Sequence, residues 1–197
     1  MYAKVNITET HLNILELFTR GFDKEYYIRE VQRLLKISPR TAQLALDDLE
    51  KKTVLESYTK GKIRLYKLRR TVEARDYITF TEIYKRIKFA EKSLKIKEII
   101  DRLSSKIEGM GLIFGSYAKG IEKKDSDLDI FIAGTYDKEE FERVSSVCGV
   151  KLDIKNYPLK LFKSELNKDI LIKEVLDDHI ILSGSECLIN MIIKPKF

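Results

Sequence analysis

The stretch Ser-Asp-Leu-Asp-Ile-Phe-Ile at residues 126–132 decides how the second half of this chain is interpreted. Aliphatic residues alternate here with Asp127 and Asp129. Successive side chains of a β-strand point to opposite faces of the sheet. The stretch therefore predicts a strand with both carboxylates on one face and the aliphatic side chains on the other.

A second stretch, Val-Lys-Leu-Asp-Ile-Lys at residues 150–155, repeats this arrangement around Asp153. If the two strands are neighbours, three carboxylates converge on one polar face, where they repel one another unless a cation lies among them. Mg²⁺ favours a few carboxylates together with substrate phosphate oxygens and water. Two such ions, about 3.5–4 Å apart, can hold the attacking and leaving oxygens of a phosphoryl or nucleotidyl transfer. We therefore expect Asp127, Asp129 and Asp153 to be metal ligands.

A glycine and a serine, Gly115 and Ser116, follow a short apolar run upstream of these strands. Glycine lets the backbone approach a phosphate closely, and serine adds a hydroxyl. If a short helix begins near Tyr117, its free amides also face a triphosphate, and Lys119 adds a positive charge. We predict nucleotide-binding roles for Gly115, Ser116, Lys119 and Ser126.

Each of these signals has a simpler explanation when it is taken singly. A Gly-Ser pair is usually a turn, and aspartates on one face of a strand usually face solvent. The three signals occur here together, in a fixed order and in phase with the strand pattern. That combination favours a catalytic site.

Gly115-Ser116, ten intervening residues, Asp127-Leu128-Asp129 and the later Asp153 resemble the DNA polymerase beta nucleotidyltransferase superfamily. The segment from residue 109 to 197 looks most like its minimal nucleotidyltransferases of bacteria and archaea. The resemblance implies that Asp127 and Asp129 ligate the metals. It implies that Asp153 helps to position or deprotonate the acceptor hydroxyl, so that all three are catalytic. Gly115 and Ser116 would hold the nucleotide phosphates, and Lys119 stands where many relatives have arginine.

The activity that this resemblance implies is a Mg²⁺-dependent transfer of a nucleotide, with two ions and with ATP or another nucleoside triphosphate as substrate. AMP is the expected group, and the acceptor is a hydroxyl on a protein or an RNA. Minimal members are often antitoxins paired with a small helical HEPN-type protein, which makes such a protein a candidate partner. No large acceptor-binding domain follows the predicted site, which favours a macromolecular acceptor by family analogy.

The first 70 residues predict three short helices followed by a β-hairpin. The expected elements are helices at 8–20, 27–36 and 39–51 and strands at 54–59 and 63–68. Ser38-Pro39 is a good helix start, because serine caps free amides and proline fits the first helical position. Leu44 is expected in the apolar stripe of this third helix. This order of elements resembles a winged helix-turn-helix domain over about residues 6–70.

A winged helix-turn-helix domain would place its third helix in the DNA major groove and its hairpin beside the phosphates. The expected base contacts are Arg40, Thr41 and Gln43, and the expected phosphate contacts are Lys60, Lys62 and Arg64. The alternative is a trihelical domain for dimerisation or partner contact. Asp47, Asp48 and Glu50 on the same helix favour that alternative slightly.

Residues 71–108 contain no internal glycine or proline and predict one or two helices, with Leu94 to Ile107 as the second apolar pattern. We expect a connector that packs on the second domain, with a homodimer surface as the alternative. The predicted domains are therefore 1–70, 71–108 and 109–197. The predicted fold class is α+β, with a small mixed sheet flanked by helices in the nucleotidyltransferase part.

The remaining elements are expected to support the site. They are helices at 137–147, 166–176 and 187–193 and a short strand at 179–182. We expect Cys148 in the core and His179 at the surface or at a strand edge. The apolar run at 188–193 is expected in the core, with an interface as the alternative.

Composition excludes several classes of protein. The 197 residues carry a net charge of +6, and the excess lies in residues 1–70, whereas residues 109–197 carry −2. Two cysteines and two histidines exclude a disulfide framework, a four-cysteine zinc site and a histidine-rich metal site. No apolar run suits a transmembrane helix or a signal peptide, so we expect a cytoplasmic protein without membrane contact.

Two functions remain open from sequence. One is the nucleotidyltransferase. The other is a DNA-binding transcriptional regulator, in which the winged helix binds double-stranded DNA and the second domain senses nucleotide or binds a partner. The two are compatible, because an antitoxin can repress its own operon.

Overall fold

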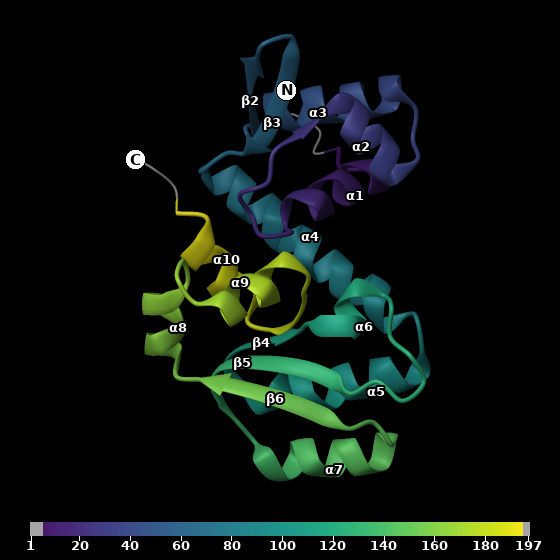
Figure 1. The fold of residues 1–197 in the computed structure, drawn as a ribbon, viewed down its shortest axis with the longest axis vertical. Coiled ribbons are helices and arrows are strands. Elements are labelled where there is room, and N and C mark those ends of the chain that lie inside the picture. The colour runs from purple at the N-terminus through teal and green to yellow at the C-terminus, as the bar shows by residue number, and fades with distance from the viewer. Residues whose placement is uncertain (1–5, 195–197) are drawn as a thin grey trace. The chain divides into compact units, whose positions relative to one another are not determined.

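The computed structural model describes residues 6–194, which divide into two compact units on either side of the bond between Thr81 and Glu82. Ile193 and Lys194 group with the first unit. Each unit has its own small sheet with helices packed around it (Figure 1), so the fold is α+β as the sequence predicts. Within the described residues, no helix has both the length and the apolar character needed to cross a membrane.

The first unit contains three short helices, a three-stranded sheet and the start of a long helix. Its elements are α1 (Glu9–Phe18), β1 (Tyr26–Tyr27), α2 (Ile28–Leu35), α3 (Pro39–Lys51), β2 (Leu55–Lys60), β3 (Ile63–Leu68) and α4 (Val72–Ala90), which continues into the second unit. The strand order is β1-β3-β2, with both pairs antiparallel. The Ser38 side chain accepts a hydrogen bond from the Thr41 backbone amide at 3.0 Å, which stabilises the start of α3. The predicted order of three helices and a hairpin is present, and the assignment to the winged-helix class stays a prediction.

Two details of the first unit differ from the sequence prediction. Tyr27 lies in the short strand β1 rather than in a helix. Leu44 is 53% exposed and lies outside the apolar stripe of α3, which consists of Ala42, Ala45, Leu46 and Leu49. Helical residues three or four positions apart share a face. Leu44 lies off the face that these four side chains bury.

The second unit is built around a four-stranded mixed sheet. Its elements are α5 (Leu94–Leu103), the 3-10 turn η1 (Ser104–Lys106), β4 (Ile107–Ile113), α6 (Gly115–Lys119), β5 (Leu128–Tyr136), α7 (Lys138–Cys148), β6 (Leu152–Tyr157), α8 (Leu159–Glu165), α9 (Ile170–Asp177), β7 (Ile180–Ser183) and α10 (Ser185–Ile192). The strand order is β6-β5-β4-β7, with β5 and β6 parallel and the other pairs antiparallel. The apolar pattern predicted that the second helix of the connector reaches Ile107. In the structure, Ile107 is instead the first residue of β4.

The two faces of this sheet differ in what covers them. The aliphatic side chains of β5, among them Ile130 and Ile132, share one core with α5 and α7. On the other face, the Phe131 ring packs against Phe162 of α8 at 5.8 Å between ring centroids. Figure 1 shows α5 and α7 on one side of the sheet and α8 and α9 on the other. The alternation along β5 therefore separates a buried aliphatic face from the face that carries the carboxylates.

Two predictions for the end of the chain are corrected. The helix expected at 166–176 begins only at Ile170, as α9, because the Asp169 side chain accepts a hydrogen bond from the Ile172 amide at 2.9 Å and caps it there. His179 is only 3% exposed rather than at the surface. Its Nε2 atom lies 3.3 Å from a carboxylate oxygen of Glu82, on α4.

Candidate active site

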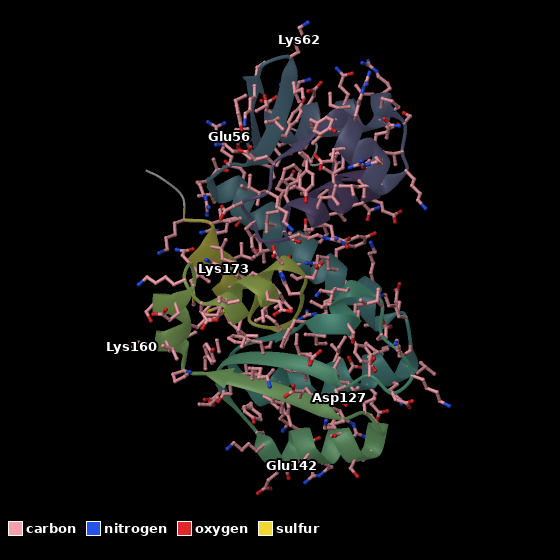
Figure 2. The ribbon with its side chains drawn as sticks, in the orientation of Figure 1. Glu56, Lys62, Asp127, Glu142, Lys160 and Lys173 are labelled. Carbon is pink, nitrogen blue, oxygen red and sulfur yellow. The ribbon has the colours of Figure 1, made fainter. Side chains whose placement is uncertain are left out.

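The three predicted carboxylates lie at the beginning of two neighbouring parallel strands. Asp129 of β5 and Asp153 of β6 are direct partners in the strand register. Asp127 lies two residues before Asp129 and therefore on the same face. The side chains of Asp127 and Asp153 are 39% and 42% exposed. Figure 2 labels Asp127 at this edge of the sheet.

The glycine turn lies directly beside this group, because β4 runs antiparallel to β5. Ile113 at the end of β4 pairs with Ile130, and the next amide, that of Phe114, donates a hydrogen bond to the Asp129 carbonyl at 3.0 Å. Gly115 has a φ of +67°, and a Cβ atom there would lie 2.1 Å from Asp129 Oδ2. Glycine at this position leaves the space that the Asp129 carboxylate fills.

The other predicted nucleotide-binding residues lie on α6 and on the loop that follows it. Ser116 is in the first turn of α6 and half-buried, and Lys119 at its last turn is exposed. Ser126 Oγ accepts a hydrogen bond from the Lys123 amide at 2.9 Å, which closes a turn of the loop. Within residues 6–194, no hydrogen bond or ion pair joins Ser116, Lys119 or Ser126 to the carboxylates. Their nucleotide-binding roles stay a prediction.

The carboxylates influence one another electrostatically. Burial raises the pKa of Asp129 above its usual value, and the negative charges of Asp153 and Asp127 raise it further. The positive charge of Lys155 acts in the opposite direction. A raised carboxyl pKa among like charges means that the ionised group is destabilised there, and that a cation would be favoured.

Two lysines that the sequence analysis did not assign contact the outer carboxylates. Lys151 Nζ lies 2.5 Å from Asp127 Oδ2, and Lys155 Nζ lies 3.1 Å from Asp153 Oδ1. The hydrogen bond and the negative charge of Asp127 raise the pKa of Lys151. The signal for this arrangement is present in the sequence. Each lysine is two residues from Asp153, so the strand period places all three side chains on one face.

The residues at this site fit a divalent cation in donor type and in charge. All three are carboxylates, which Mg²⁺ prefers, and their crowding favours a positive charge between them. Among the described residues, no group of three or more His, Cys, Asp or Glu side chains is already positioned to hold a metal ion. Lys151 and Lys155 contact one oxygen each of Asp127 and Asp153, two of the carboxylates that would hold such an ion.

The predicted DNA contacts lie on α3 and on the β2–β3 hairpin. Arg40 and Thr41 are exposed in the first turn of α3, Gln43 is half-buried, and Lys60 and Lys62 are exposed at the hairpin. Their role in DNA binding stays a prediction.

Arg64, the third predicted phosphate contact, is occupied within the protein. Its guanidinium group contacts Asp47 at 3.1 Å and also pairs with Glu50. The same group lies 4.9 Å from the centre of the Tyr66 ring. Arg64 therefore ties the hairpin to α3.

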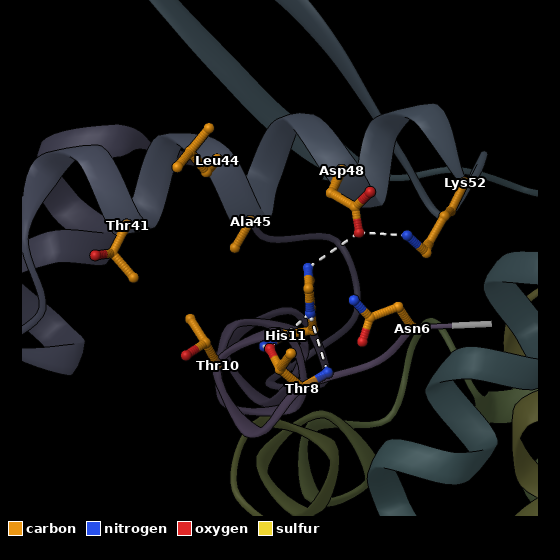
Figure 3. Close-up of a pocket in the computed structure, with 9 residues that line it drawn as sticks. All are labelled: Asn6, Thr8, Thr10, His11, Thr41, Leu44, Ala45, Asp48 and Lys52. Atoms are coloured by element: carbon orange, nitrogen blue, oxygen red, sulfur yellow. Dashed lines mark hydrogen bonds and ion pairs between the residues drawn. The ribbon is translucent and has the colours of Figure 1, made fainter. Parts of the chain in front are cut away.

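A groove of about 510 Å³ lies between the start of α1 and one face of α3 (Figure 3). Its lining includes His11, Asp48 and Lys52, and His11 Nε2 lies 3.1 Å from Asp48 Oδ2. Burial lowers the pKa of His11, although the charge of Asp48 opposes this effect. Thr41 lines the same groove, so one predicted base contact faces this hollow.

Comparison with known proteins found a family model that is similar to part of the chain. The model of the family described as "Polymerase beta, Nucleotidyltransferase" matches residues 94–186. The matched stretch runs from α5 into α10 and includes the three carboxylates and the glycine turn. Neither a search of curated proteins nor a search of solved structures found a match. The match supports the polymerase beta superfamily and nucleotidyl transfer in general for this part of the chain.

Proposed function

We propose that the second unit transfers a nucleoside monophosphate, AMP in the first instance, from a nucleoside triphosphate to the hydroxyl of an acceptor. The observation that carries this proposal is the register of β5 and β6, which pairs Asp129 with Asp153 beside the Gly115 turn. Two like charges that face each other across a ladder weaken a sheet. A divalent cation bound between Asp129 and Asp153 during catalysis would offset this repulsion and so explain why the two carboxylates are paired.

The reaction exchanges one phosphorus–oxygen bond for another. The acceptor oxygen attacks the α-phosphorus, the bond to the β-phosphate oxygen breaks, and pyrophosphate leaves. Asp127, Asp129 and Asp153 would hold Mg²⁺, which supplies positive charge to the attacking and leaving oxygens. The free amides at the start of α6 and the Ser116 hydroxyl face the triphosphate. Asp153 accepts the proton of the acceptor hydroxyl.

The test is transfer of label from ATP labelled at the α-phosphate, in the presence of Mg²⁺, to the protein itself, to cellular RNA and to cellular protein. We expect label from the α-position and none from the γ-position, and no transfer by Asp127→Ala. Asp125→Ala is the matched control, since Asp125 is exposed in the preceding loop. Equal labelling by the wild type and Asp127→Ala would contradict the proposal.

The acceptor and the antitoxin role are proposals that rest on the resemblance of the sequence to minimal nucleotidyltransferases. We propose a macromolecular hydroxyl, on a protein or an RNA, and a HEPN-type helical protein as the first acceptor to test. If a small helical protein is encoded beside this chain, adding it to the labelling reaction should give a labelled band at its mass. Label on RNA instead would assign the other acceptor class.

The exposed hairpin supports a second candidate function, binding of double-stranded DNA by the first unit. Lys60 and Lys62 lie at its tip, and neither has a carboxylate partner in the part of the chain that the structure describes. Each phosphate contact contributes about one unit to the slope of log affinity against log salt concentration. We expect Lys60→Gln with Lys62→Gln to reduce this slope by about two. Absence of duplex binding at low salt would remove this candidate.

A further inference from the structure

The polar face at the start of β5 and β6 carries an ordered row of charges. Lys151 lies beside Asp127, Asp153 lies beside Asp129, and Lys155 follows two residues further along β6, opposite Phe131. The two lysines contact the two outer carboxylates. Within residues 6–194, Asp129 is the one carboxylate of the three without an ion-pair partner.

This row contains almost as much positive as negative charge before any ligand binds. Three carboxylates face two ammonium groups, and each ammonium group contacts an oxygen that a divalent cation would use as a ligand. A cation that enters alone therefore has to displace both contacts. It also meets two positive charges within a few ångströms, which weakens its binding.

We propose that Lys151 and Lys155 couple the binding of the divalent cation to the binding of the nucleotide. In the free protein they hold Asp127 and Asp153. When a triphosphate arrives, its oxygens attract the lysines, and the carboxylates become available to the cation. The inference rests on the proposed function, because it concerns the same triphosphate and the same carboxylates.

The two lysine side chains are free enough for this exchange. Lys151 is 76% exposed and Lys155 is 46% exposed, so neither ammonium group is enclosed by the fold. A lysine carries its charge on a flexible four-carbon chain and can turn to a phosphate oxygen. Exposed ion pairs are individually weak, so only a small free energy of interaction is lost when the lysines leave the carboxylates.

The experiment measures Mn²⁺ binding by the electron paramagnetic resonance of the free ion, with and without α,β-methylene-ATP, which cannot release pyrophosphate. Binding of Mn²⁺ to the analogue itself is subtracted. The proteins are the wild type, Lys151→Gln, Lys155→Gln, the double variant and Asp129→Asn. Lys163→Gln is the matched control, since Lys163 is an exposed lysine of α8 that forms no ion pair with the three carboxylates within residues 6–194. Thermal unfolding checks that each variant is folded.

We expect each of the two substitutions to tighten Mn²⁺ binding to the free protein by about two- to fivefold, and the double variant to combine both effects. The analogue should then bind more weakly, and its effect on Mn²⁺ affinity should shrink. By linkage, the effect of Mn²⁺ on the affinity for the analogue shrinks by the same factor. Lys163→Gln should match the wild type, and Asp129→Asn should lose Mn²⁺ binding.

Unchanged Mn²⁺ affinity in both lysine variants would overturn the inference, and so would a wild type in which Mn²⁺ and the analogue bind independently. Turnover is read separately from labelled ATP. Loss of transfer with the coupling intact would contradict the proposed reaction and leave the role of the lysines standing.

Discussion

At the scale of single residues, Gly115 and Asp129 compete for one small space. A Cβ atom at Gly115 would lie 2.1 Å from Asp129 Oδ2, and the left-handed φ adds backbone strain. We expect Gly115→Ala to displace the carboxylate and to reduce nucleotidyl transfer by about 100-fold, the effect of a misplacement of roughly 1 Å. The measurement is the initial rate at saturating Mg²⁺.

A matched control separates backbone strain from the lost space. Gly149 also has a positive φ, of +57°, but a Cβ atom there would meet no atom within 4 Å. We expect Gly149→Ala to lower the thermal midpoint about as much as Gly115→Ala and to keep its activity. Equal loss of activity in both variants would contradict the role assigned to Gly115.

Asp129 also gives a prediction on stability. Its pKa is raised in the folded protein, so its contribution to stability is fully present below the unfolded pKa and is lost as pH rises through the folded pKa. At neutral pH and without divalent cations, Asp129→Asn should therefore be more stable than the wild type, by roughly 0.2–1 kcal/mol for a pair of like charges across a ladder. Urea unfolding in chelator at pH 7 measures this. A less stable Asp129→Asn would contradict it.

The sequence predicted the carboxylates and missed other groups for identifiable reasons. Period-two alternation places side chains on faces without any knowledge of tertiary contacts, so the shared face of Asp127 and Asp129 followed from spacing alone. That Asp153 joins them depends on the pairing of β5 with β6, which the sequence analysis could state only as a condition. The same rule covers Lys151 and Lys155, but charged residues at a strand end are commonly solvated. The burial of His179 depends on Glu82, which lies far away in the sequence, and no local pattern contains that information.

At the scale of elements, a buried contact between Glu82 and His179 joins α4 to the chain just before β7. The Glu82 carboxylate is fully buried, 2.9 Å from Lys85 Nζ and 3.3 Å from His179 Nε2. Burial alone would raise the pKa of Glu82, but Lys85 and His179 outweigh it and lower this pKa to about 2. Glu82→Gln removes the carboxylate that the buried Lys85 and His179 contact, so it should destabilise the second unit by about 3 kcal/mol.

The pH dependence of stability checks the same contact. A lowered carboxyl pKa contributes stability above the unfolded value of 4.5, and this contribution is lost as pH falls towards about 2. We expect the wild type to lose stability across that interval and Glu82→Gln to lose less. Glu91→Gln, at an exposed position just beyond α4, should follow the wild type. Identical acid unfolding of the wild type and Glu82→Gln would contradict the pairing.

Element prediction was accurate where capping and periodicity agree. The start of α3 after Ser38 and the end of α7 before Gly149 carry local signals that the structure retains. Helix α8 is not predicted from the sequence, because a short helix that packs through Phe162 has little periodic pattern of its own. Strand β1 contains two residues, and its pairing with β3 is a tertiary contact that no local sequence pattern specifies.

At the scale of the whole molecule, the two units predict separate responses to ligands. A ligand present at 100 times its dissociation constant stabilises the folded state that binds it by about 2.7 kcal/mol. We expect calorimetry to resolve two transitions, of which Mg²⁺ with α,β-methylene-ATP raises only the one that belongs to the second unit. The single variant Asp129→Asn should abolish that shift. A shift of both transitions together would show that the units unfold cooperatively.

The distribution of charge along the chain can be read from the sequence more readily than the boundary between the two units. The positive excess of residues 1–70 belongs to the first unit as expected. The structure divides the chain within α4, a helix without any glycine, proline or polar linker at that point. A boundary inside a continuous helix leaves no compositional mark, so the predicted domain limits were set by turns and strand starts instead.

The hydrogen-bonded ladder between β5 and β6 determines which changes to the chain the site tolerates. Hydrogen bonds between the strands, rather than the length of chain between them, set the separation of Asp129 and Asp153. The crossover through α7 can therefore be lengthened, shortened or cut without moving one carboxylate relative to the other, provided that the ladder still forms. Two fragments that end and begin at the exposed turn around Gly149, outside the packed part of α7, should reassemble into one site, which makes this turn the natural place to split the protein into a conditional pair.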